Sequence, residues 1–391
     1  MNIDNGTDIS TVCVHGCKKH YDTTGAIAVP IFASATFTHP GVGQSTGFDY
    51  SRSQNPTKEY LEHTITALEC SVASNGVACS GAETIAFSTG MAAVSALMEL
   101  FSPGDHIVAS ADLYGGTFRL FSRISEKNGL RFSYADSAED IVALVKPDTK
   151  AVFLETPTNP MMRVVDIAAV AQVTKTKNIL LIVDNTFLTP VFQRPITLGA
   201  DIVLHSGTKY LGGHNDTLAG TLTASSAGLA EKLRYIAKTT GGCLSPFDSF
   251  LIVRGIKTLA IRMKRQQETA LAVAKWLRGQ SNVKAVYYTG LPDHSGYEIS
   301  CRQASGFGGM ISFAVKEEKT AVKILESVKV IQYAESLGGA ESLITYPMLQ
   351  THAEIPENER LERGIDACLL RLSVGLEAAD DIMADLKQAM E

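Results

Sequence analysis

Short apolar runs alternate with longer stretches of helical periodicity along much of the chain. Four of the runs are clear, at residues 106–109, 151–154, 179–183 and 202–204. Apolar runs of this length, separated by helical stretches, are typical of units in which parallel strands form one sheet and helices cover it. The pattern therefore predicts an α/β domain built on a mostly parallel sheet.

Polar clusters follow three of these apolar runs directly, at residues 155–160, 184–186 and 205–209. The carboxyl ends of parallel strands meet at one edge of a sheet, and ligands bind in the crevice outside that edge. We therefore expect the three clusters to contribute to a single site.

The pattern changes near residue 250. A basic and amphipathic stretch at 251–278 predicts one long connecting helix, and an apolar run at 309–315 predicts a strand beyond it. The first 50 residues are rich in Gly, Pro, Thr and His and lack periodicity, so we expect an arm that packs elsewhere, on another subunit. We divide the chain into an N-terminal arm (1–51), a large domain (52–250) and a smaller α+β C-terminal domain (251–391).

Composition and charge favour a globular protein that acts on small molecules. Hydrophobic residues make up 45% of the 391 residues, which is enough for an extensive core. The formal net charge is -6 and both signs are interspersed, so no basic stripe supports binding to nucleic acid. No segment approaches the ~18 apolar residues of a membrane helix. We expect neither nucleic acid nor membrane as a partner.

The seven cysteines are an odd number and are scattered along the chain. No secretory leader follows Met1, so we interpret them as reduced thiols and expect a cytoplasmic protein. Cys13 and Cys17 have histidines nearby, but their spacing does not fit paired zinc ligands. We therefore expect no metal site.

Three groups near the polar clusters suit one cofactor. Lys209 stands between a buried run and a glycine pair, which is a poor position for a solvated surface lysine. Asp184 ends an apolar run, where a buried carboxylate must be paired, although a helix cap would also explain it. Residues 88–90 precede a helix whose free N–H groups could hold a phosphate, or they could form an ordinary N-cap. An amine, a carboxylate and an anion cup are what pyridoxal 5'-phosphate (PLP) requires.

Other classes of protein fit less well. Residues 43–47 match the G-x-S-x-G pattern of hydrolases, but that motif needs a strand before it and a helix after it, which the flanking sequence does not predict. The glycines near Lys209 follow the lysine instead of preceding it, so they do not form a P-loop. A non-catalytic binding or regulatory protein with a PLP fold stays an alternative. It would predict the loss of a chemical residue, and none is missing.

The segment at 205–216 (HSGTKYLGGHND) closely resembles the lysine signature of the PLP-dependent enzymes of Cys/Met metabolism, the transsulfuration family. Further segments resemble the same family in order, at 50–57, 88–93, 113–117, 155–160, 184–186, 336–339, 351–352 and 371–375. The likeness covers nearly the whole chain. It implies PLP fold type I, like that of aspartate aminotransferase, with PLP as the cofactor.

The resemblance also implies roles for individual residues. Lys209 would carry PLP and move substrate protons, Tyr114 would stack on the ring and assist, and Asp184 would pair with the ring nitrogen. The phosphate ligands would be Gly90, Met91, Ser206 and Thr208 from the same subunit, and Tyr50 and Arg52 from a neighbouring one. The substrate carboxylate would be bound by Asn159, Ser336 and Arg371, of which the arginine would use a bidentate fork. The polar end of the substrate or of the incoming amino acid would be bound by Asp49, Arg119 and Glu335.

Among members of the family, the chain looks most like the cystathionine γ-synthases and O-acetylhomoserine thiol-lyases of Gram-positive type. This implies γ-replacement on an O-acylhomoserine, with cysteine or sulfide as the thiol. Gly116 stands where methionine γ-lyases typically have cysteine, which counts against that activity. Cystathionine γ-lyase and β-lyase stay alternatives, because γ-lyases share most of the polar residues. The resemblance further implies small amino-acid substrates and a homotetramer of two catalytic dimers. The segment at 70–83 is longer than the family's usual connection.

Overall fold

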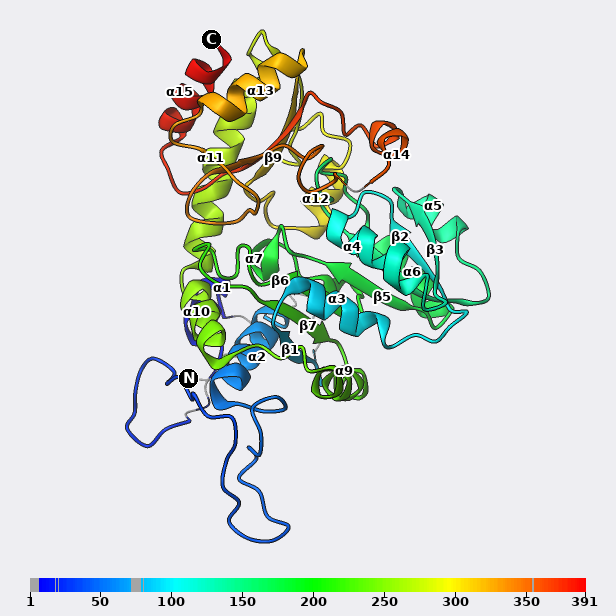
Figure 1. Ribbon diagram of the computed structural model, residues 1–391, viewed down its shortest axis with the longest axis vertical. Helices are drawn as coiled ribbons and strands as arrows, with labels where there is room; N and C mark the ends of the chain where they lie inside the picture. Colours follow the sequence, from blue (N-terminus) through cyan, green and yellow to red (C-terminus); the bar gives the residue numbers. More distant parts are fainter. Residues whose placement is uncertain (1–6, 18, 20, 72–78, 80, 354) are drawn as a thin grey trace.

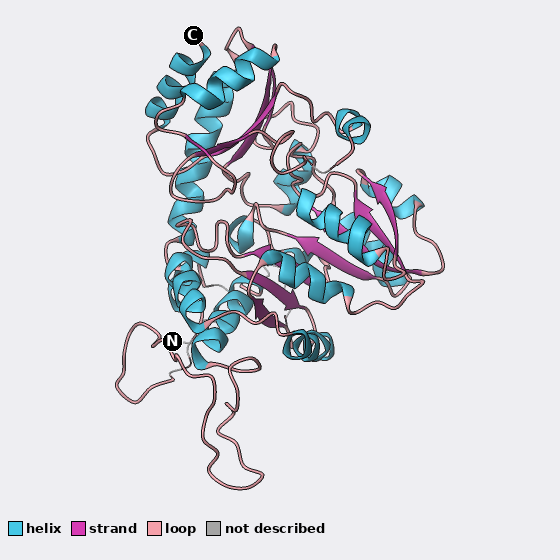
Figure 2. Cartoon of the chain, viewed as in Figure 1, coloured by secondary structure: helices cyan, strands magenta, loops and turns pink. Residues whose placement is uncertain are grey.

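The computed structural model of the chain describes residues 7–17, 19, 21–71, 79, 81–353 and 355–391. These residues form two sheets, each with its own helices (Figure 2). The larger sheet has seven strands in the order β1-β7-β6-β5-β4-β2-β3, and the smaller has five in the order β10-β11-β12-β9-β8.

In the larger sheet only β7 runs against its neighbours, so the sheet is mostly parallel, as predicted. Its strands are β1 (Glu83–Phe87), β2 (His106–Ser110), β3 (Arg131–Ala135), β4 (Thr149–Glu155), β5 (Leu180–Asp184), β6 (Ile202–Ser206) and β7 (Gly220–Ala224). Four of them lie where the apolar runs predicted strands. The sheet therefore confirms the fold class expected for this part of the chain.

Successive strand residues point to opposite faces of the larger sheet, and both faces are buried. Ile107 and Ile182 pack with α3 and α9 on one face, whereas Val108 and Leu181 pack with α5, α6 and α8 on the other. This double burial explains why the strands are continuously apolar in sequence. The helices of this part of the chain are α2 (Pro56–Glu69), α3 (Gly90–Met98), α4 (Gly115–Leu120), the π-helix η1 (Phe121–Ser125), α5 (Ala138–Ala143), α6 (Ile167–Thr176), α7 (Thr189–Phe192), α8 (Pro195–Leu198) and α9 (Ala227–Thr240).

The smaller sheet is mostly antiparallel, and one face of it packs on α11, α13 and α15 around Phe313 and Leu370. Its strands are β8 (Val283–Tyr287), β9 (Met310–Val315), β10 (Gln332–Tyr333), β11 (Leu343–Thr345) and β12 (Leu369–Ser373). The helices in this part are α11 (Leu259–Arg278), α12 (Tyr297–Gln303), α13 (Glu318–Ser327), α14 (Glu357–Glu362) and α15 (Ala379–Met390), whereas α10 (Pro246–Ile256) packs on α2 beside the larger sheet. Helix α11 runs from the core around the larger sheet to the core of the smaller one (Figure 1).

The single helix expected over 251–278 is wrong, because two helices, α10 and α11, meet at Lys257 and Thr258. At Gly255 a Cβ would lie 2.1 Å from the carbonyl oxygen of Gly212, so α10 ends in close contact with the loop that follows Lys209. Arg262 of α11 donates to Gly255 O at 2.9 Å and to Thr258 Oγ1 at 3.0 Å. These bonds occupy acceptors at the break and fix the angle between the helices.

The N-terminal arm is only partly separate from the body. Its short helix α1 (Ile9–His15) buries Val12 and Cys13 against α2 and α11. Residues 21–54 run mostly away from both sheets (Figure 1), and Ile27 and Val42 are almost fully exposed. Helix α2 then begins at Pro56, with the Asn55 side chain accepting from Thr57 N at 3.0 Å as its N-cap.

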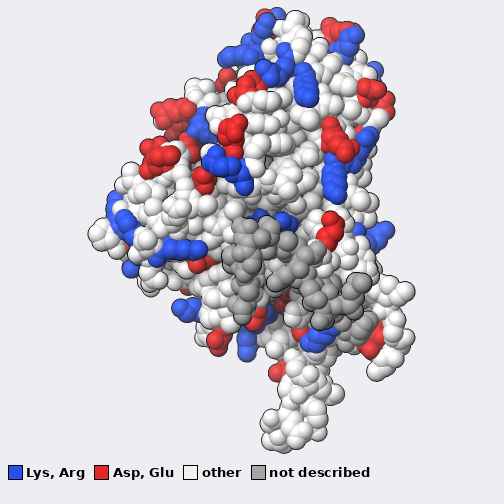
Figure 3. All heavy atoms as spheres, turned by 180° about the vertical axis from the view of Figure 1, so that it is seen from behind, with Lys and Arg blue, Asp and Glu red and all other residues white. Residues whose placement is uncertain are grey.

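Charged side chains of both signs are interspersed on the face seen in Figure 3, which agrees with the mixed pattern in sequence. Within the described residues, no helix has both the length and the apolar character needed to cross a membrane.

Candidate active site

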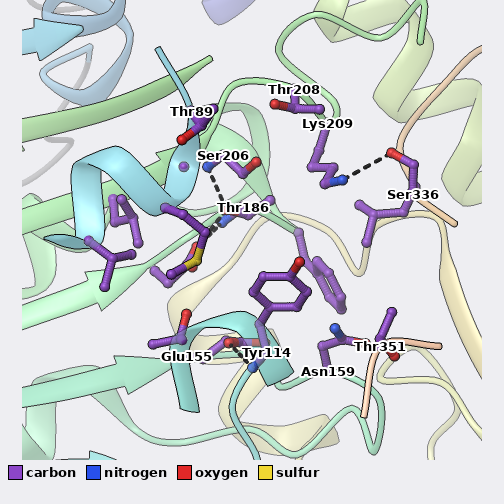
Figure 4. Close-up of a pocket in the computed structure, with 18 of the residues that line it drawn as sticks. Thr89, Tyr114, Glu155, Asn159, Thr186, Ser206, Thr208, Lys209, Ser336 and Thr351 are labelled. Atoms are coloured by element: carbon purple, nitrogen blue, oxygen red, sulfur yellow. Dashed lines mark hydrogen bonds between the residues drawn. The ribbon is translucent and has the colours of Figure 1, made fainter. Parts of the chain in front are cut away.

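The three polar clusters meet in one cavity of about 350 Å³ at the carboxyl ends of β4, β5 and β6, as predicted. The N-terminus of α3 closes one side of it, and the segment before β11 with strand β12 closes another. The predicted site residues that line it are Gly90, Met91, Tyr114, Asn159, Asp184, Ser206, Thr208, Lys209, Glu335, Ser336 and Arg371. Segments far apart in sequence therefore build a single pocket (Figure 4).

Lys209 lies in the loop after β6, and its Nζ donates a hydrogen bond to Ser336 Oγ at 3.0 Å (Figure 4). Burial and the nearby charge of Arg371 lower the pKa of Lys209 to about 8, while Glu335 opposes the shift. The amine is thus more readily deprotonated near neutral pH than an ordinary lysine. A neutral amine of this kind can act as a nucleophile or as a base.

Ser336 has a φ of 116°, which is a strained conformation for a residue with a side chain. Its Oγ accepts from Lys209, and its carbonyl oxygen accepts from Arg371 Nη2 at 2.9 Å. Strain of this kind costs about 1–3 kcal/mol and is held by surrounding contacts, most often at functional sites. Lys209 and Arg371, the cationic side chains that line the pocket, therefore hold Ser336 in this conformation.

Arg371 is the largest fully buried side chain of the described residues, on the central strand β12 of the smaller sheet. Its guanidinium donates to Asn159 Oδ1 at 2.9 Å, to Ser336 O and to Thr345 Oγ1, all of which are neutral acceptors. Its Nε has no partner among the described residues. Burial lowers the pKa of Arg371 to about 10. A buried cation without an anionic partner is costly, so the site suits a carboxylate ligand.

Asp184 ends β5, and its Oδ1 accepts two hydrogen bonds from Thr186, one from N–H at 3.0 Å and one from Oγ1 at 2.5 Å. Thr186 Oγ1 in turn accepts from Ser206 N at 2.9 Å (Figure 4). Burial raises the pKa of Asp184, and the bonds from Thr186 oppose this. Because one carboxylate oxygen is occupied by Thr186, the other is left for a cationic partner in the cavity.

Glu155 lies beside Asp184 at the end of β4, and its Oε2 accepts from Tyr114 N at 2.9 Å. Burial raises its pKa well above the usual carboxyl range, and the neighbouring charge of Asp184 adds to the effect. Two carboxylates this close and this buried do not both ionise readily. Burial raises the pKa of Glu155 more strongly than that of Asp184, so Glu155 holds the proton and Asp184 carries the charge.

The N-terminus of α3 offers an anion cup. Thr89 accepts from Ala92 N through its Oγ1 and from Ala93 N through its carbonyl, which leaves the N–H groups of Gly90 and Met91 without intrahelical acceptors. A Cβ at Gly90 would lie 3.1 Å from Ser206 Oγ, so the glycine lets the helix approach β6 closely. Backbone donors and hydroxyls in this arrangement suit a phosphate group.

Tyr114 projects its ring into the cavity, and 41% of its surface is exposed. A Cβ at Gly116 would lie 2.5 Å from the Cε1 atom of this ring and 3.2 Å from Met91 Sδ. The absence of a side chain at position 116 therefore makes room for the ring in this position.

Four predicted residues do not line this cavity. Asp49 and Tyr50 lie at the end of the exposed arm, and the exposed Arg52 directly follows it; the Arg52 guanidinium stacks 5.5 Å from the Tyr50 ring, and Asp49 accepts from Ser45. Arg119 lines a separate hollow on the other side of α4, together with Phe118 and Glu359. Their predicted roles stay predictions, and for the arm residues those roles require a second subunit.

Sequence reasoning gave no role to several residues that shape the site. Glu155 and Thr186 stood in family segments, but their contacts were not foreseen. His352 is buried, and its Nε2 lies within hydrogen-bonding distance, 3.0 Å, of Asn159 O. His205 on β6 and Glu69 at the end of α2 are both completely buried, and His205 Nε2 lies 2.5 Å from Glu69 Oε1. The apolar residues around Glu69 in sequence are the one local sign that its carboxylate is enclosed.

The segment at 70–83, noted for its length, is only partly described, since residues 72–78 and 80 lie outside the described residues. Among the described residues, no group of three or more His, Cys, Asp or Glu side chains is arranged to hold a metal ion.

These features fit PLP: a partly buried lysine amine, a carboxylate with one free oxygen, a phosphate cup and an unpaired buried arginine lie around one cavity. Lys209 would carry the cofactor, Asp184 would face the ring nitrogen, and the α3 N-terminus with Ser206 and Thr208 would hold the phosphate. The ring of Tyr114 lies in the same cavity as these groups.

Comparison with known proteins agrees with this fit. The family model for Cys/Met metabolism PLP-dependent enzymes matches residues 10–391. A cystathionine gamma-synthase of Haemophilus influenzae is 47% identical over 97% of both chains, and a cystathionine beta-lyase of Lactococcus lactis is 46% identical over 98% of this chain and 99% of its own. The crystal structure of a cystathionine gamma-lyase from Lactobacillus plantarum complexed with L-serine superposes with a TM-score of 0.92, at 41% identity over 98% of both chains. The chain therefore belongs to the PLP-dependent enzymes of Cys/Met metabolism.

Proposed function

We propose that the protein catalyses γ-replacement: a thiol takes the place of the acyloxy group on Cγ of an O-acylhomoserine, which leaves as a carboxylate, and the product is cystathionine with cysteine or homocysteine with sulfide. The relatives include both synthases and lyases at nearly equal identity, so the proposal depends on the site. The observation that carries it is the contrast between Arg371, which is buried in the cavity, and Glu335, which is exposed and lines the same cavity.

The buried end of the cavity suits the first substrate. The carboxylate of an amino acid would neutralise the unpaired charge of Arg371, and Asn159 would orient the guanidinium through the bond to its Nη1. This places the substrate's α-carbon near Lys209 Nζ, whose bond to Ser336 also ties it to this end of the cavity. Binding and proton transfer thus use neighbouring groups.

PLP, when bound, supplies the electron sink that makes removal of protons next to the amino group possible. Loss of a γ-leaving group requires protons to leave both Cα and Cβ of the substrate. Lys209 Nζ is the base that we propose for both, because its lowered pKa of about 8 lets it accept a proton near neutral pH and because its long side chain can swing between the two carbons. Tyr114 would assist, since its ring lines the same cavity.

The exposed end suits a second amino acid. Glu335 is close enough to Lys209 to affect its pKa, yet the side chain is open to solvent. A carboxylate there can bind the ammonium group of an incoming cysteine. In a lyase the same carboxylate would bind the distal ammonium group of cystathionine, so the assay below decides between the two reactions. Sulfide has no ammonium group, so it makes no use of this contact.

The test is a steady-state assay of the purified protein with O-acetylhomoserine or O-succinylhomoserine, with cysteine or sulfide as the thiol, beside cystathionine alone. We expect replacement products to form faster than cystathionine is cleaved. Rapid cleavage of cystathionine with no use of either ester would show that the protein is a lyase.

A matched variant tests the role of the carboxylate. Glu335→Gln should raise the KM for cysteine about two- to fivefold, the value of one exposed ion pair, and should leave the KM for sulfide unchanged. Equal effects on the two thiols would argue against the proposed contact.

We also propose that the assembly is a homotetramer of two catalytic dimers in which the arm of one subunit supplies Asp49, Tyr50 and Arg52 to the site of its neighbour. The support is that these residues are exposed on an arm that extends away from their own cavity.

A further inference from the structure

A buried pair of ionisable side chains, Glu69 and His205, joins the end of α2 to strand β6 next to the candidate active site. Both side chains are fully buried, and the 2.5 Å between His205 Nε2 and Glu69 Oε1 is a hydrogen-bond distance. Glu69 Oε2 and His205 Nδ1 have no partner among the described residues. Because a buried charge needs a partner of opposite sign, the two side chains depend on each other.

The backbone places His205 one residue away from the strand position opposite Asp184. Leu204, the residue before it, is the register partner of Asp184 on β5. Ser206, the residue after it, donates from its N–H to Thr186 Oγ1 at 2.9 Å (Figure 4), and Thr186 Oγ1 donates to Asp184 Oδ1. Leu204 and Ser206 line the cavity, so the side chain of His205 between them points to the opposite face of the sheet. One layer of backbone therefore separates the imidazole from the cavity.

The charge of His205 acts on Asp184 across this layer. Burial raises the pKa of Asp184, and the hydrogen bonds from Thr186 and the positive charge of His205 oppose the rise. Glu69 contacts the imidazole from α2, on the side of the sheet away from the cavity. The pair is therefore oriented, with its cation nearer to Asp184 and its anion farther away.

We propose that Glu69 and His205 are positioning residues for PLP: Glu69 holds His205 as an imidazolium, and the imidazolium stabilises the carboxylate form of Asp184. A stabilised carboxylate is a weaker base, so the proton between Asp184 and the ring nitrogen would stay on the nitrogen. PLP acts as an electron sink best with this nitrogen protonated. The inference rests on the proposed role of Asp184, and it holds for replacement and elimination alike.

Removal of the Glu69 charge should neutralise His205. Burial lowers the pKa of Arg194 and the charge of Glu69 opposes this, so a second cation lies near the same carboxylate. Without Glu69, a buried imidazolium would have no anionic partner and would lie near that cation, which is costly. Glu69→Gln keeps the shape of the side chain and an acceptor for the Nε2–H group. It therefore tests the charge while it preserves the contact.

The first test uses PLP labelled with ¹⁵N in its ring, because the NMR shift of this nitrogen separates its protonated form from its neutral form. The wild-type protein should show the protonated shift, and Glu69→Gln should move it toward the neutral one. Glu62→Gln is the matched control, since it removes another buried carboxylate of α2, whose cationic partner is Arg234. It should lower the stability of the fold and leave the shift unchanged. An unchanged shift in Glu69→Gln would overturn the proposal.

Asp184→Asn separates the role of the pair from the role of Asp184 itself. This variant should show the neutral shift, because an amide does not stabilise a protonated ring nitrogen. A neutral shift in Asp184→Asn together with a protonated shift in Glu69→Gln would reject the pair and keep Asp184. A neutral shift in the wild type would overturn both assignments, and neither result depends on the outcome of the substrate assay.

The affinity for PLP gives a second measurement that does not depend on turnover. Glu69→Gln should raise the Kd of PLP about three- to tenfold, since one charge that favours the Asp184 carboxylate is lost. The double variant Glu69→Gln/His205→Gln has no charge in the pair and should show a similar rise, so it replaces the single variant if that one does not fold. A Kd equal to the wild-type value in either variant would contradict the proposal.

Discussion

Glu155 and Asp184 are direct register partners at the carboxyl ends of the parallel strands β4 and β5. Side chains of such partners point to the same side of a sheet, so the two carboxyl groups lie next to each other at the cavity wall, Glu155 buried and Asp184 half-buried. Thr186 stabilises the charge on Asp184, and Tyr114 N–H contacts Glu155. We therefore expect the two carboxyl groups to hold one proton between them, and that proton to lie on Glu155.

This arrangement predicts a specific pH dependence of stability. The pKa of Glu155 is raised on folding, so the folded state holds a proton that the unfolded chain releases near pH ~4.3. The stability from this proton is complete below that pH and is lost as the pH rises through the folded pKa. Glu155→Gln mimics the protonated acid, so its free energy of unfolding should fall less steeply between pH 5 and 8.

Urea unfolding of the PLP-loaded protein at several pH values measures this slope. The difference between wild type and Glu155→Gln should approach but not exceed about 1.4 kcal/mol per pH unit, the value for one proton. The exposed Glu99→Gln is the control and should keep the wild-type slope. Parallel curves for wild type and Glu155→Gln would mean that Glu155 is ionised.

Arg371→Lys should strongly weaken catalysis although it keeps the charge. The guanidinium bonds Asn159, Ser336 and Thr345 at once, and a lysine cannot make these bonds and also grip a carboxylate with two parallel donors. We expect kcat/KM to fall roughly 10²-fold, or about 2.7 kcal/mol, with most of the loss in KM.

The visible absorbance of bound PLP should be nearly normal in Arg371→Lys, because Lys209 is intact. The exposed Arg302→Lys variant is the control and should behave as the wild type. An unchanged KM in Arg371→Lys would show that Arg371 does not bind the substrate carboxylate.

Gly116→Ala should displace the ring of Tyr114. The new methyl group would lie 2.5 Å from Cε1 of that ring, and Met91 Sδ closes the other side at 3.2 Å. The expected result is a changed visible circular dichroism of bound PLP and a kcat at least about tenfold lower, since Tyr114 is proposed to assist proton transfer. Gly228→Ala is the control, because a Cβ there meets nothing within 4 Å. Unchanged spectra and kcat in Gly116→Ala would show that the Tyr114 ring can accommodate the methyl group without leaving its functional position.

The larger sheet could be predicted from sequence because the signals are local. Each central strand is a short apolar run, and the polar residues that follow it mark the edge where Asp184 and Lys209 lie. The break between α10 and α11 could not be predicted in this way. The helical pattern continues through it, and its cause is contact between Gly255 and the loop after Lys209, far away in sequence.

The same distinction between local signals and contacts of distant segments applies to the site residues. The family segments named the groups that line the cavity, but not the contacts that tune them. The bond between Glu69 and His205 joins two separate elements, so neither residue alone indicates it. Arg119 lies more than one helical turn beyond Tyr114 on α4, and this turns it toward another hollow. Spacing in sequence shows that the two residues are near each other, not that they face the same cavity.

Subunit mixing tests whether the arm acts on a neighbouring site. Arg52→Ala and Lys209→Ala should each have little or no activity: the first should lack a phosphate contact and the second the cofactor-bearing amine. In a mixed dimer, one site would take its arm from the Lys209→Ala subunit and its lysine from the Arg52→Ala subunit, so both contributions would be intact. If subunits combine at random from equal amounts, about half of the dimers contain one such site. Activity should therefore return to roughly one quarter of the wild-type value per subunit, measured after exchange is verified by native mass spectrometry. Mixed oligomers that stay inactive would mean that each site is built within one chain.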